Sequence, residues 1–376
     1  MASVNRKSGE MKPIVAGNMK VHLLWFDSMG AKSSSLLLET PDIKLLIDPG
    51  AAVMQPSFPL SEAEKKLLCQ KAFGAINKAA KKADTIFISH YHYDHHTLPD
   101  EPHELELYEG KNIWVKNPNL WINRSQWGRA RLFLSLLYEG LKGSGFENLL
   151  YPAQRRNFPD LLKNLPLASR KDYGDYEKRK KQLLRKGKAW FRNTANLWKK
   201  GKWVPEFSLG STEVFFADGK SIKVGGTKIK FTEPLFHGIE YDRVGWVLGL
   251  VCEYKAAKFL YSSDLQGPQI EDYAEWIIKE NPDILILDGP ATYLLGYMLN
   301  KINLARAVSN ASQVLRKTTS KVMIYDHHLT RGTRYKERVS KVYEVAHEEK
   351  KTLLTAAEWL GKETLVLKLG RNAKNR

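Results

Sequence analysis

The chain has 376 residues, of which 43% are hydrophobic, and it carries a formal net charge of +18. This length and apolar content are enough for one large domain or two average ones with a buried core. No apolar run reaches the roughly 20 residues of a membrane-spanning helix, so we expect a cytoplasmic protein that is neither secreted nor membrane-bound. Two cysteines are too few for a disulfide framework or for a structural zinc site built on several thiolates.

The N-terminal part of the chain predicts a tail followed by strands. Residues 1–18 are polar and aperiodic, which is typical of a flexible tail. Turn residues separate three apolar runs that predict strands: 21–26, 34–39 and 43–47. The third run ends at Asp48. Apolar positions at helical spacing then predict a helix over 62–82, and 85–89 has the composition of a short buried strand.

A basic stretch at about 151–210 interrupts this regular pattern. It holds 16 Lys and Arg against 5 Asp and Glu, a net charge of +11, with aromatic residues between the cations. We interpret it as an insertion with helices at 176–188 and 190–200. Cations beside aromatic rings are one way to bind nucleic acid. The alternatives are a solvated face and tryptophans that form the insertion's own core.

After residue 220, strand patterns return and then alternate with helices. The predicted strands of this alternation are 283–287, 321–325 and 364–368. Strand-rich meanders followed by β/α units occur twice along the chain. This order predicts an α/β fold with two stacked mixed sheets and outer helices. We therefore expect one catalytic domain over 19–376, interrupted by the basic insertion.

Seven of the ten histidines fall into three clusters: His90, His92, His95 and His96; His237; His327 and His328. Alternate residues of an extended segment face the same side, so His90 and His92 can hold one ion together. Asp94 and His95 follow where the chain turns, and they can face a second ion. Imidazole and carboxylate ligands suit Zn, Mn or Fe.

The pattern His-x-His-x-Asp-His at 90–95 resembles the metallo-β-lactamase superfamily, and the resemblance extends over about residues 19–370. The other motifs of that superfamily are also present, in the order along the chain that the superfamily has. Asp48 precedes the 90–95 motif, and His237, Asp264 and His327 come after it. A closer resemblance is to a branch of predicted metal-dependent hydrolases in archaea and bacteria. That resemblance rests on the motifs that begin at Asp27, His90, Ser263, Asp288 and Asp326. The branch is defined by sequence and implies no substrate.

The resemblance implies an αββα sandwich with two divalent metal ions roughly 3.5–4 Å apart, zinc being expected and Mn or Fe being alternatives. The implied ligands of the first metal are His90, His92 and His237. Those of the second are Asp94, His95 and His327, with His328 as the alternative to His327. Asp264 would bridge both metals. Asp48 would be a buried acid that positions a ligand, and Asp94 would also orient the attacking water and take its proton.

The function implied is a binuclear hydrolase in which a metal-activated hydroxide attacks an ester-type or phosphodiester bond of an anionic or ester-type substrate. One alternative is a nuclease that holds RNA or DNA on the basic insertion. The segment from His327 to Tyr335 loosely resembles the last motif of tRNase Z, so Arg331 and Arg334 are candidates for binding phosphate. Tyr93 is a further candidate for substrate contact. The other alternative is a polyanion-binding protein with a vestigial site. No heptad or apolar patch indicates an oligomer.

Overall fold

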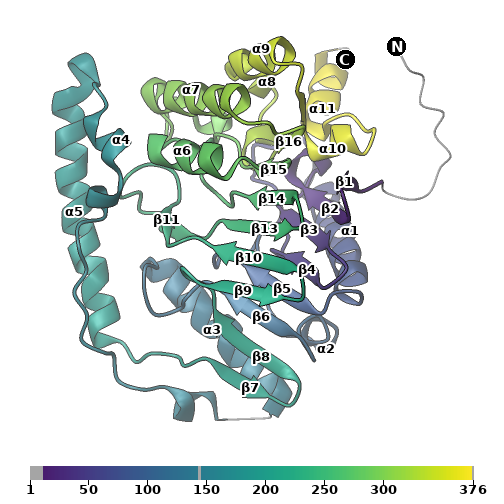
Figure 1. The fold of residues 1–376 in the computed structure, drawn as a ribbon, viewed down its shortest axis with the longest axis vertical. Helices are drawn as coiled ribbons and strands as arrows, with labels where there is room; N and C mark the ends of the chain where they lie inside the picture. Colours follow the sequence, from purple (N-terminus) through teal and green to yellow (C-terminus); the bar gives the residue numbers. More distant parts are fainter. Residues whose placement is uncertain (1–11, 143–144, 375–376) are drawn as a thin grey trace.

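Two β-sheets stacked face to face form the centre of the structure, a computed structural model that describes residues 12–142 and 145–374 (Figure 1). The first sheet has the strand order β1-β2-β3-β4-β5-β6-β8-β7, and the second has the order β17-β16-β15-β14-β13-β10-β9. Strands β11 and β12 pair separately. Helices lie outside the two sheets, so the expected α/β sandwich is confirmed.

The strands of the first sheet are β1 Ile14–Ala16, β2 Met19–Phe26, β3 Ser34–Glu39, β4 Lys44–Ile47, β5 Thr85–Ile88, β6 Asn112–Val115, β7 Phe207–Leu209 and β8 Thr212–Phe216. The strands of the second sheet are β9 Ser221–Val224, β10 Thr227–Phe231, β13 Leu250–Tyr254, β14 Ala257–Tyr261, β15 Ile284–Leu287, β16 Val322–Tyr325 and β17 Thr352–Leu354. The separate pair is β11 Leu235–Phe236 and β12 Trp246–Val247.

The α-helices are α1 Glu62–Ala80, α2 Pro102–Leu105, α3 Arg124–Lys142, α4 Pro166–Arg170, α5 Glu177–Lys200, α6 Glu271–Glu280, α7 Lys301–Lys317, α8 Tyr335–Arg338, α9 Ser340–Glu348, α10 Ala356–Trp359 and α11 Leu365–Lys374. The short 3-10 helices are η1 Asp27–Met29, η2 Phe146–Leu149, η3 Leu161–Asn164, η4 Gly174–Tyr176, η5 Thr292–Leu294 and η6 Leu329–Arg331. No helix within the described residues is both long and apolar enough to cross a membrane.

Both sheets have the same plan, an antiparallel part followed by a parallel part. Strands β1 to β4 are antiparallel neighbours, and β5, β6 and β8 continue the sheet in parallel with β4. In the second sheet β9, β10, β13 and β14 are antiparallel, and β15, β16 and β17 continue in parallel. Parallel strands end at one edge of a sheet, so the segments that follow β4, β5, β14, β15 and β16 meet at one edge of the sandwich.

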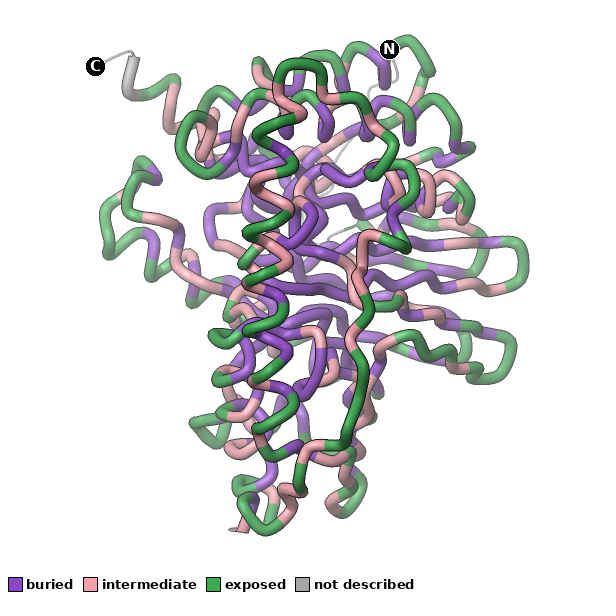
Figure 2. The backbone as a smooth tube through the Cα atoms, turned by 90° about the vertical axis from the view of Figure 1, so that its left-hand side faces the viewer, coloured by how far each residue is buried: buried purple, intermediate pink, exposed green. Residues whose placement is uncertain are grey.

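The core lies in two layers, one between the sheets and one beneath the helices. Leu36 and Phe87 of the first sheet pack in one buried cluster with Ile229, Phe259 and Ile324 of the second. A larger cluster lies between the outer faces of the sheets and the helices. Figure 2 shows this burial as purple strands at the centre, with exposed segments at the loops and on outward helix faces. Strands buried on both sides explain why their sequences are continuous apolar runs.

Two predictions made from local pattern are wrong in part. Residues 14–16, which we placed in the N-terminal tail 1–18, form β1, because Ile14 is buried and pairs with Val21 of β2. Residues 1–11 of that tail lie outside the described residues. The predicted strand 364–368 falls in helix α11, because a short apolar run does not by itself distinguish a strand from a helix.

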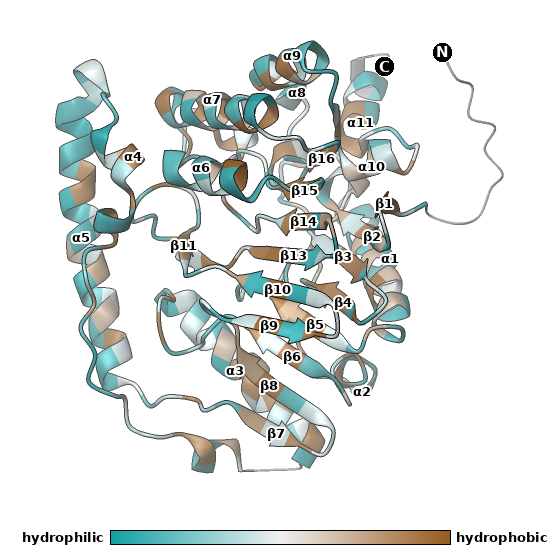
Figure 3. Cartoon of the chain, viewed as in Figure 1, coloured by the Kyte–Doolittle hydropathy of each residue, from teal (hydrophilic) through white to brown (hydrophobic). Residues whose placement is uncertain are grey.

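The basic stretch 151–210 is dominated by a single helix. The two predicted windows, 176–188 and 190–200, form the continuous helix α5, which runs along one side of the molecule and is hydrophilic over most of its length (Figure 3). Its aromatic side chains Phe191 and Trp198 are buried, as is Trp203 beyond its end. Most of the aromatic residues therefore pack as a core. The last residues of the stretch enter the first sheet as β7.

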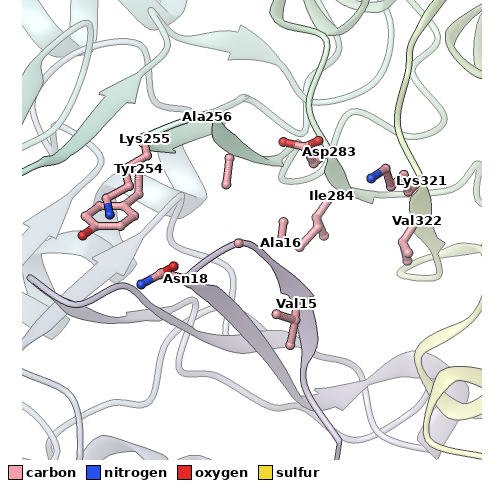
Figure 4. Close-up of a pocket in the computed structure, with 12 residues that line it drawn as sticks. Val15, Ala16, Asn18, Tyr254, Lys255, Ala256, Asp283, Ile284, Lys321 and Val322 are labelled. Carbon is pink, nitrogen blue, oxygen red and sulfur yellow. The ribbon is translucent and has the colours of Figure 1, made fainter.

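A hollow of about 450 Å³ lies at the edge opposite to these strand ends (Figure 4). Val15 of β1 lines it, together with the first residues of β15 and β16, Ile284 and Val322. No histidine lines this hollow. Six of the seven clustered histidines follow the carboxyl ends of the parallel strands β5 and β16, so the chemistry is concentrated at the other edge of the sandwich.

Candidate metal centre

Asp48 ends strand β4 and holds three side chains in place. Its Oδ2 atom accepts hydrogen bonds from Ser89 Oγ at 2.6 Å, Tyr261 Oη at 2.7 Å and His95 Nδ1 at 2.8 Å, and its Oδ1 accepts from Ser89 N at 2.7 Å. Because every oxygen already accepts, Asp48 orients His95 rather than offering a free ligand atom. Gly50 follows at a position where a Cβ atom would lie 2.2 Å from the backbone nitrogen of His96. This close approach requires glycine.

The first group of ligand atoms comes from the segment that leaves β5 and from the loop between β11 and β12. His90 Nε2 lies 3.0 Å from His92 Nδ1, and His237 Nε2 lies within the same group. Gln126 of helix α3 places its Nε2 3.3 Å from His92 Nε2. Gln266 places its Nε2 3.2 Å from His237 Nδ1. These amides help to fix the ring orientations of the two histidines.

Asp264 follows β14 and lies at the centre of the histidines. Its Oδ2 atom is 3.4 Å from His90 Nε2, 3.1 Å from His95 Nε2, 3.2 Å from His237 Nε2 and 3.6 Å from His327 Nε2. The side chain of Asp264 is almost fully buried. One carboxylate among four imidazole nitrogens is the arrangement that a bridging ligand between two ions requires.

A second group of ligand atoms comes from both sheets. Asp94, His95 and His327 offer atoms that all lie within 4.8 Å of one another. His327 follows β16, and its Nδ1 atom donates to Asp27 Oδ1 at 2.9 Å. Asp27 therefore orients His327 as Asp48 orients His95, so that both Nε2 atoms face Asp264. A hydrogen bond at Nδ1 is the usual way to fix the ring of a ligating histidine.

The donors fit divalent cations. The buried atoms His237 Nε2, Asp264 Oδ1 and Asp264 Oδ2 form no hydrogen bond in the structure. Buried polar atoms almost always have partners, so three at one point indicate a ligand. Burial alone would lower the pKa of His95, but Asp264 and Asp48 outweigh it and raise the pKa to about 10. The carboxylates therefore create a strong preference for positive charge at this point.

Comparisons with known proteins agree with this geometry. The chain is 35% identical over 366 residues to a UPF0282 protein of Methanopyrus kandleri, covering 94% of this chain and 98% of that protein. The chain belongs to the UPF0282 family. A UPF0282 protein of Korarchaeum cryptofilum is 30% identical over 355 residues, covering 94% of this chain and 93% of that protein. Residues 30–96 match the model of the metallo-β-lactamase superfamily, in agreement with the resemblance that the motif at 90–95 indicates.

Solved structures also resemble the UPF0282 chain. The metallo-β-lactamase fold protein YhfI from Bacillus subtilis is 14% identical, with a TM-score of 0.41, and covers 90% of this chain and 95% of its own. Human tRNase Z, short form, is 13% identical with a TM-score of 0.36, covering 79% of this chain and 86% of its own.

The three predicted substrate-binding residues of the UPF0282 chain lie in different surroundings. Arg331 is buried: its Nε donates to Asp27 Oδ2, and its Nη2 lies 3.3 Å from Asp94 Oδ2. Arg334 is exposed and bonds Glu337 of the same helix, with Nε 2.8 Å from Oε2. Arg331 therefore bonds two carboxylates and Arg334 one, and phosphate binding by these arginines stays a prediction. Tyr93 lies half-exposed, with the guanidinium of Arg129 4.7 Å from the ring centroid.

His327 and His328 occupy different surroundings. His328 has its Nδ1 3.0 Å from Asp288 Oδ1, while its Nε2 is 3.9 Å from Asp264 Oδ2. His327 is closer to Asp264 and also shares a group with Asp94 and His95. The geometry therefore favours His327 as the ligand over its alternative, His328.

This difference predicts distinct metal contents for the two alanine variants. We expect His327→Ala to bind one divalent ion per chain and His328→Ala to keep two, because only His327 faces Asp94 and His95. Metal content after dialysis against zinc, measured by inductively coupled plasma mass spectrometry, checks this expectation. The exposed residue His103 offers a matched control, since His103→Ala should keep two ions. The reverse order of losses would make His328 the ligand.

Three residues that support the histidines were not predicted as site residues. Asp27 follows a strand end, as Asp48 and Asp264 do, and that position was the available signal. Gln126 lies inside a helix and Gln266 in a loop, and neither carries a sequence signal of its role. Side chains that act through tertiary contacts from such positions are found only once the fold is known.

Proposed function

We propose that the UPF0282 chain is a binuclear metal-dependent hydrolase that acts on an ester-type or phosphodiester bond. The observation that carries this proposal is the Asp264 carboxylate, which is buried among four histidine Nε2 atoms with both of its oxygens free of hydrogen bonds. Such a donor set suits Zn, Mn or Fe, zinc being the expected metal.

The residues divide into ligands and the groups that hold them. His90, His92 and His237 would hold one ion and Asp94, His95 and His327 the other, with Asp264 shared. Two divalent ions, when bound, lower the pKa of a water molecule and polarise the bond under attack. Asp48 and Asp27 keep the Nε2 atoms of His95 and His327 directed at the centre.

Asp94 is the residue best placed to handle the proton of the attacking water. Arg331 Nη2 lies 3.3 Å from its Oδ2 atom and fixes its orientation. Burial alone would raise the pKa of Asp94, but His95, His327 and Arg331 outweigh it and hold the pKa well below its usual range. The carboxylate is therefore ionised at neutral pH and able to accept a hydrogen bond from the attacking water.

The complete set of donors supports hydrolysis over a polyanion-binding protein with a vestigial site. A vestigial site would be expected to lose ligands or their supporting carboxylates, whereas here Asp27, Asp48 and Asp264 all make the contacts that a working site needs. We place the activity in the cytoplasm, because Cys69 and Cys252 are both buried and unpaired, as is usual in a reducing compartment.

Hydrolysis of bis(p-nitrophenyl) phosphate tests the proposal. We expect turnover that depends on added Zn or Mn and that disappears in His92→Ala, because that variant loses a ligand of the first ion. The matched control is His347→Ala, at an exposed position on helix α9, which should keep full activity. Activity that survives in His92→Ala or in excess chelator would contradict a metal-dependent mechanism. Turnover of lactones or thioesters alone would assign the ester-type bond instead.

A further inference from the structure

The outer surface of helix α5 is a cationic face that the hydrolytic centre does not use. Eight cations on this helix are exposed: Lys178, Arg179, Lys181, Arg185, Lys186, Arg192, Lys199 and Lys200. Among the described residues, only Lys181 of these eight pairs with an acid, Glu177, and Glu177 is the one acidic residue of the helix. At about 1.5 Å per residue, the distance from Lys178 to Lys200 is about 33 Å along the helix.

The inner face of the same helix is fixed against the loop that carries His237. Lys180 Nζ lies 2.5 Å from Glu240 Oε2, and Arg306 Nη2 of helix α7 lies 2.8 Å from Glu240 Oε1. At Gly187 a Cβ atom would lie 2.5 Å from Tyr241 Cβ, so the helix and the loop are in close contact. Figures 1 and 2 show α5 running along one side of the molecule. The cationic face is therefore held rigidly beside the metal centre.

A hollow between α5 and the start of helix α3 adds a place for a flat aromatic group. It has a volume of about 600 Å³, and Trp190, Asn193, Asn196, Arg124 and Lys200 line it. Trp190 is a partly exposed member of an aromatic cluster in which Trp198 is fully buried. An indole ring with two amides and two cations around it can stack a base, bond its edge and neutralise phosphates.

The hollow is connected to two ligands of the first ion through intervening residues. Arg124 is in the same helical turn as Gln126, whose Nε2 lies 3.3 Å from His92 Nε2. Trp190 stacks on Trp246, with ring centroids 5.5 Å apart and planes at 12°. The backbone nitrogen of His237 donates at 3.0 Å to the carbonyl of Gly245, which precedes Trp246. The residues that line the hollow are therefore joined to the site through Gln126 and Trp246.

We propose that single-stranded RNA docks along the exposed face of α5, with one base in the hollow at Trp190. As a statement about the substrate, this proposal rests on the proposed function. A length of about 33 Å covers roughly ten nucleotides of a stacked strand at about 3.4 Å each. A duplex hides its bases, whereas RNA commonly presents unpaired bases that stack on aromatic rings, so the hollow favours single-stranded RNA over duplex DNA.

Fluorescence anisotropy with a labelled RNA of about 12 nucleotides tests the docking surface in the full chain, in EDTA so that no hydrolysis occurs. We expect Arg185→Glu/Arg192→Glu to weaken binding by about tenfold or more and to reduce the salt slope by about 1.4, for two lost phosphate contacts at about 0.7 each. The control Lys223→Glu/Lys228→Glu has the same change of charge at exposed positions of β9 and β10 and should bind as the parent does.

Trp190 tests the base-binding part. We expect Trp190→Ala to weaken RNA binding by about tenfold and Trp190→Phe to restore most of it, because stacking needs an aromatic face. If the alanine variant unfolds, Asn193→Ala/Asn196→Ala tests the same hollow without a change of charge, because it removes the amides expected to bond the base edge and leaves the Trp246 stack in place. Equal losses in both charge-reversal variants, or duplex DNA binding as tightly as the RNA, would overturn the proposal.

The result also separates this proposal from the proposed function. The protein could bind RNA but hydrolyse neither RNA nor bis(p-nitrophenyl) phosphate with any metal. That result would support the docking surface and contradict the proposed hydrolase. Metal-dependent phosphodiester hydrolysis by a protein that does not bind the RNA in EDTA would retain the hydrolase and overturn the docking surface.

Discussion

Replacing Asp264 with alanine is expected to abolish hydrolysis and to leave less than one tightly bound metal ion per chain. The Oδ2 atom of Asp264 lies 3.1 Å from His95 Nε2 and 3.2 Å from His237 Nε2, so one substitution removes the ligand that both metal positions share. Losing several kcal/mol of metal-ion stabilisation corresponds to about 10³-fold or more in kcat/KM. Metal content and phosphodiester hydrolysis, measured on the same preparation, check the two halves of this expectation.

The stability of the metal-free fold is measured alongside, because the substitution has two opposing effects on it. Removing Asp264 takes away a carboxylate that raises the pKa of His95, but it also removes two buried oxygens that form no hydrogen bond. Asp175→Ala, at an exposed position in η4, is the matched control and should keep both ions and full activity. A variant at Asp264 that retains two ions and turns over substrate would show that the carboxylate is not the bridging group.

Asp27→Ala is expected to destabilise the protein by about 3–5 kcal/mol and also to weaken the second metal position by about 10- to 100-fold. Asp27 is fully buried and bonds the side chains of both His327 and Arg331. Burial alone would raise its pKa, but Arg331 and His327 outweigh it and hold the pKa well below its usual range. Its loss leaves the Arg331 guanidinium buried with the longer contacts to Asp94 and His327, and it leaves His327 Nδ1 with the carbonyl of Ser33 as its remaining partner among the described residues.

Urea unfolding of the metal-free protein measures the first effect, and zinc titration calorimetry measures the second. Asp27→Asn keeps the size of the side chain and one acceptor oxygen, so it should lose less stability than Asp27→Ala while still weakening the second metal position. If Asp27→Ala unfolds at the same urea concentration as the parent, the ion pair with Arg331 contributes little. If both variants bind two ions with parental affinity, Asp27 does not orient His327.

Much of the candidate site could be predicted because its residues follow strand ends in a fixed order. His90, His92 and His95 lie within six residues of each other, directly after an apolar run. Asp48 and Asp264 likewise follow runs that the structure shows as β4 and β14. In the parallel parts of the two sheets the carboxyl ends of the strands meet at one edge. Local pattern and fold class together were therefore enough to predict that these residues lie near one another.

What the sequence could not predict depends on contacts between distant segments. Arg331 follows the last histidine motif, and nothing in the neighbouring sequence indicates that it is paired. Its partner, Asp27, is 304 residues away along the chain. The role of Gln126 depends in the same way on helix α3 lying against the segment after β5. The strand predicted at 364–368 is wrong for a different reason, since a run of three apolar residues fits a helix as well as a strand.

For the basic stretch 151–210, composition alone does not predict which cations are buried and which are exposed. Its charge could be counted, but only the fold shows that Lys180 is buried against Glu240 while Arg185 and Arg192 face outward. Burial alone would raise the pKa of Glu240, yet Arg306 and Lys180 outweigh it and lower the pKa to about 2. Part of the positive charge thus holds α5 in place, and the rest forms an exposed face.

Anomalous X-ray diffraction from crystals grown with zinc, recorded on both sides of the zinc edge, tests the central claim most directly. Two anomalous peaks are predicted, one within reach of His90, His92, His237 and Asp264, and the other within reach of Asp94, His95, His327 and Asp264. Repeating the experiment at the manganese and iron edges identifies the metal that the protein retains from the cell. No peak at these residues, or metal bound only elsewhere, would contradict a binuclear hydrolase.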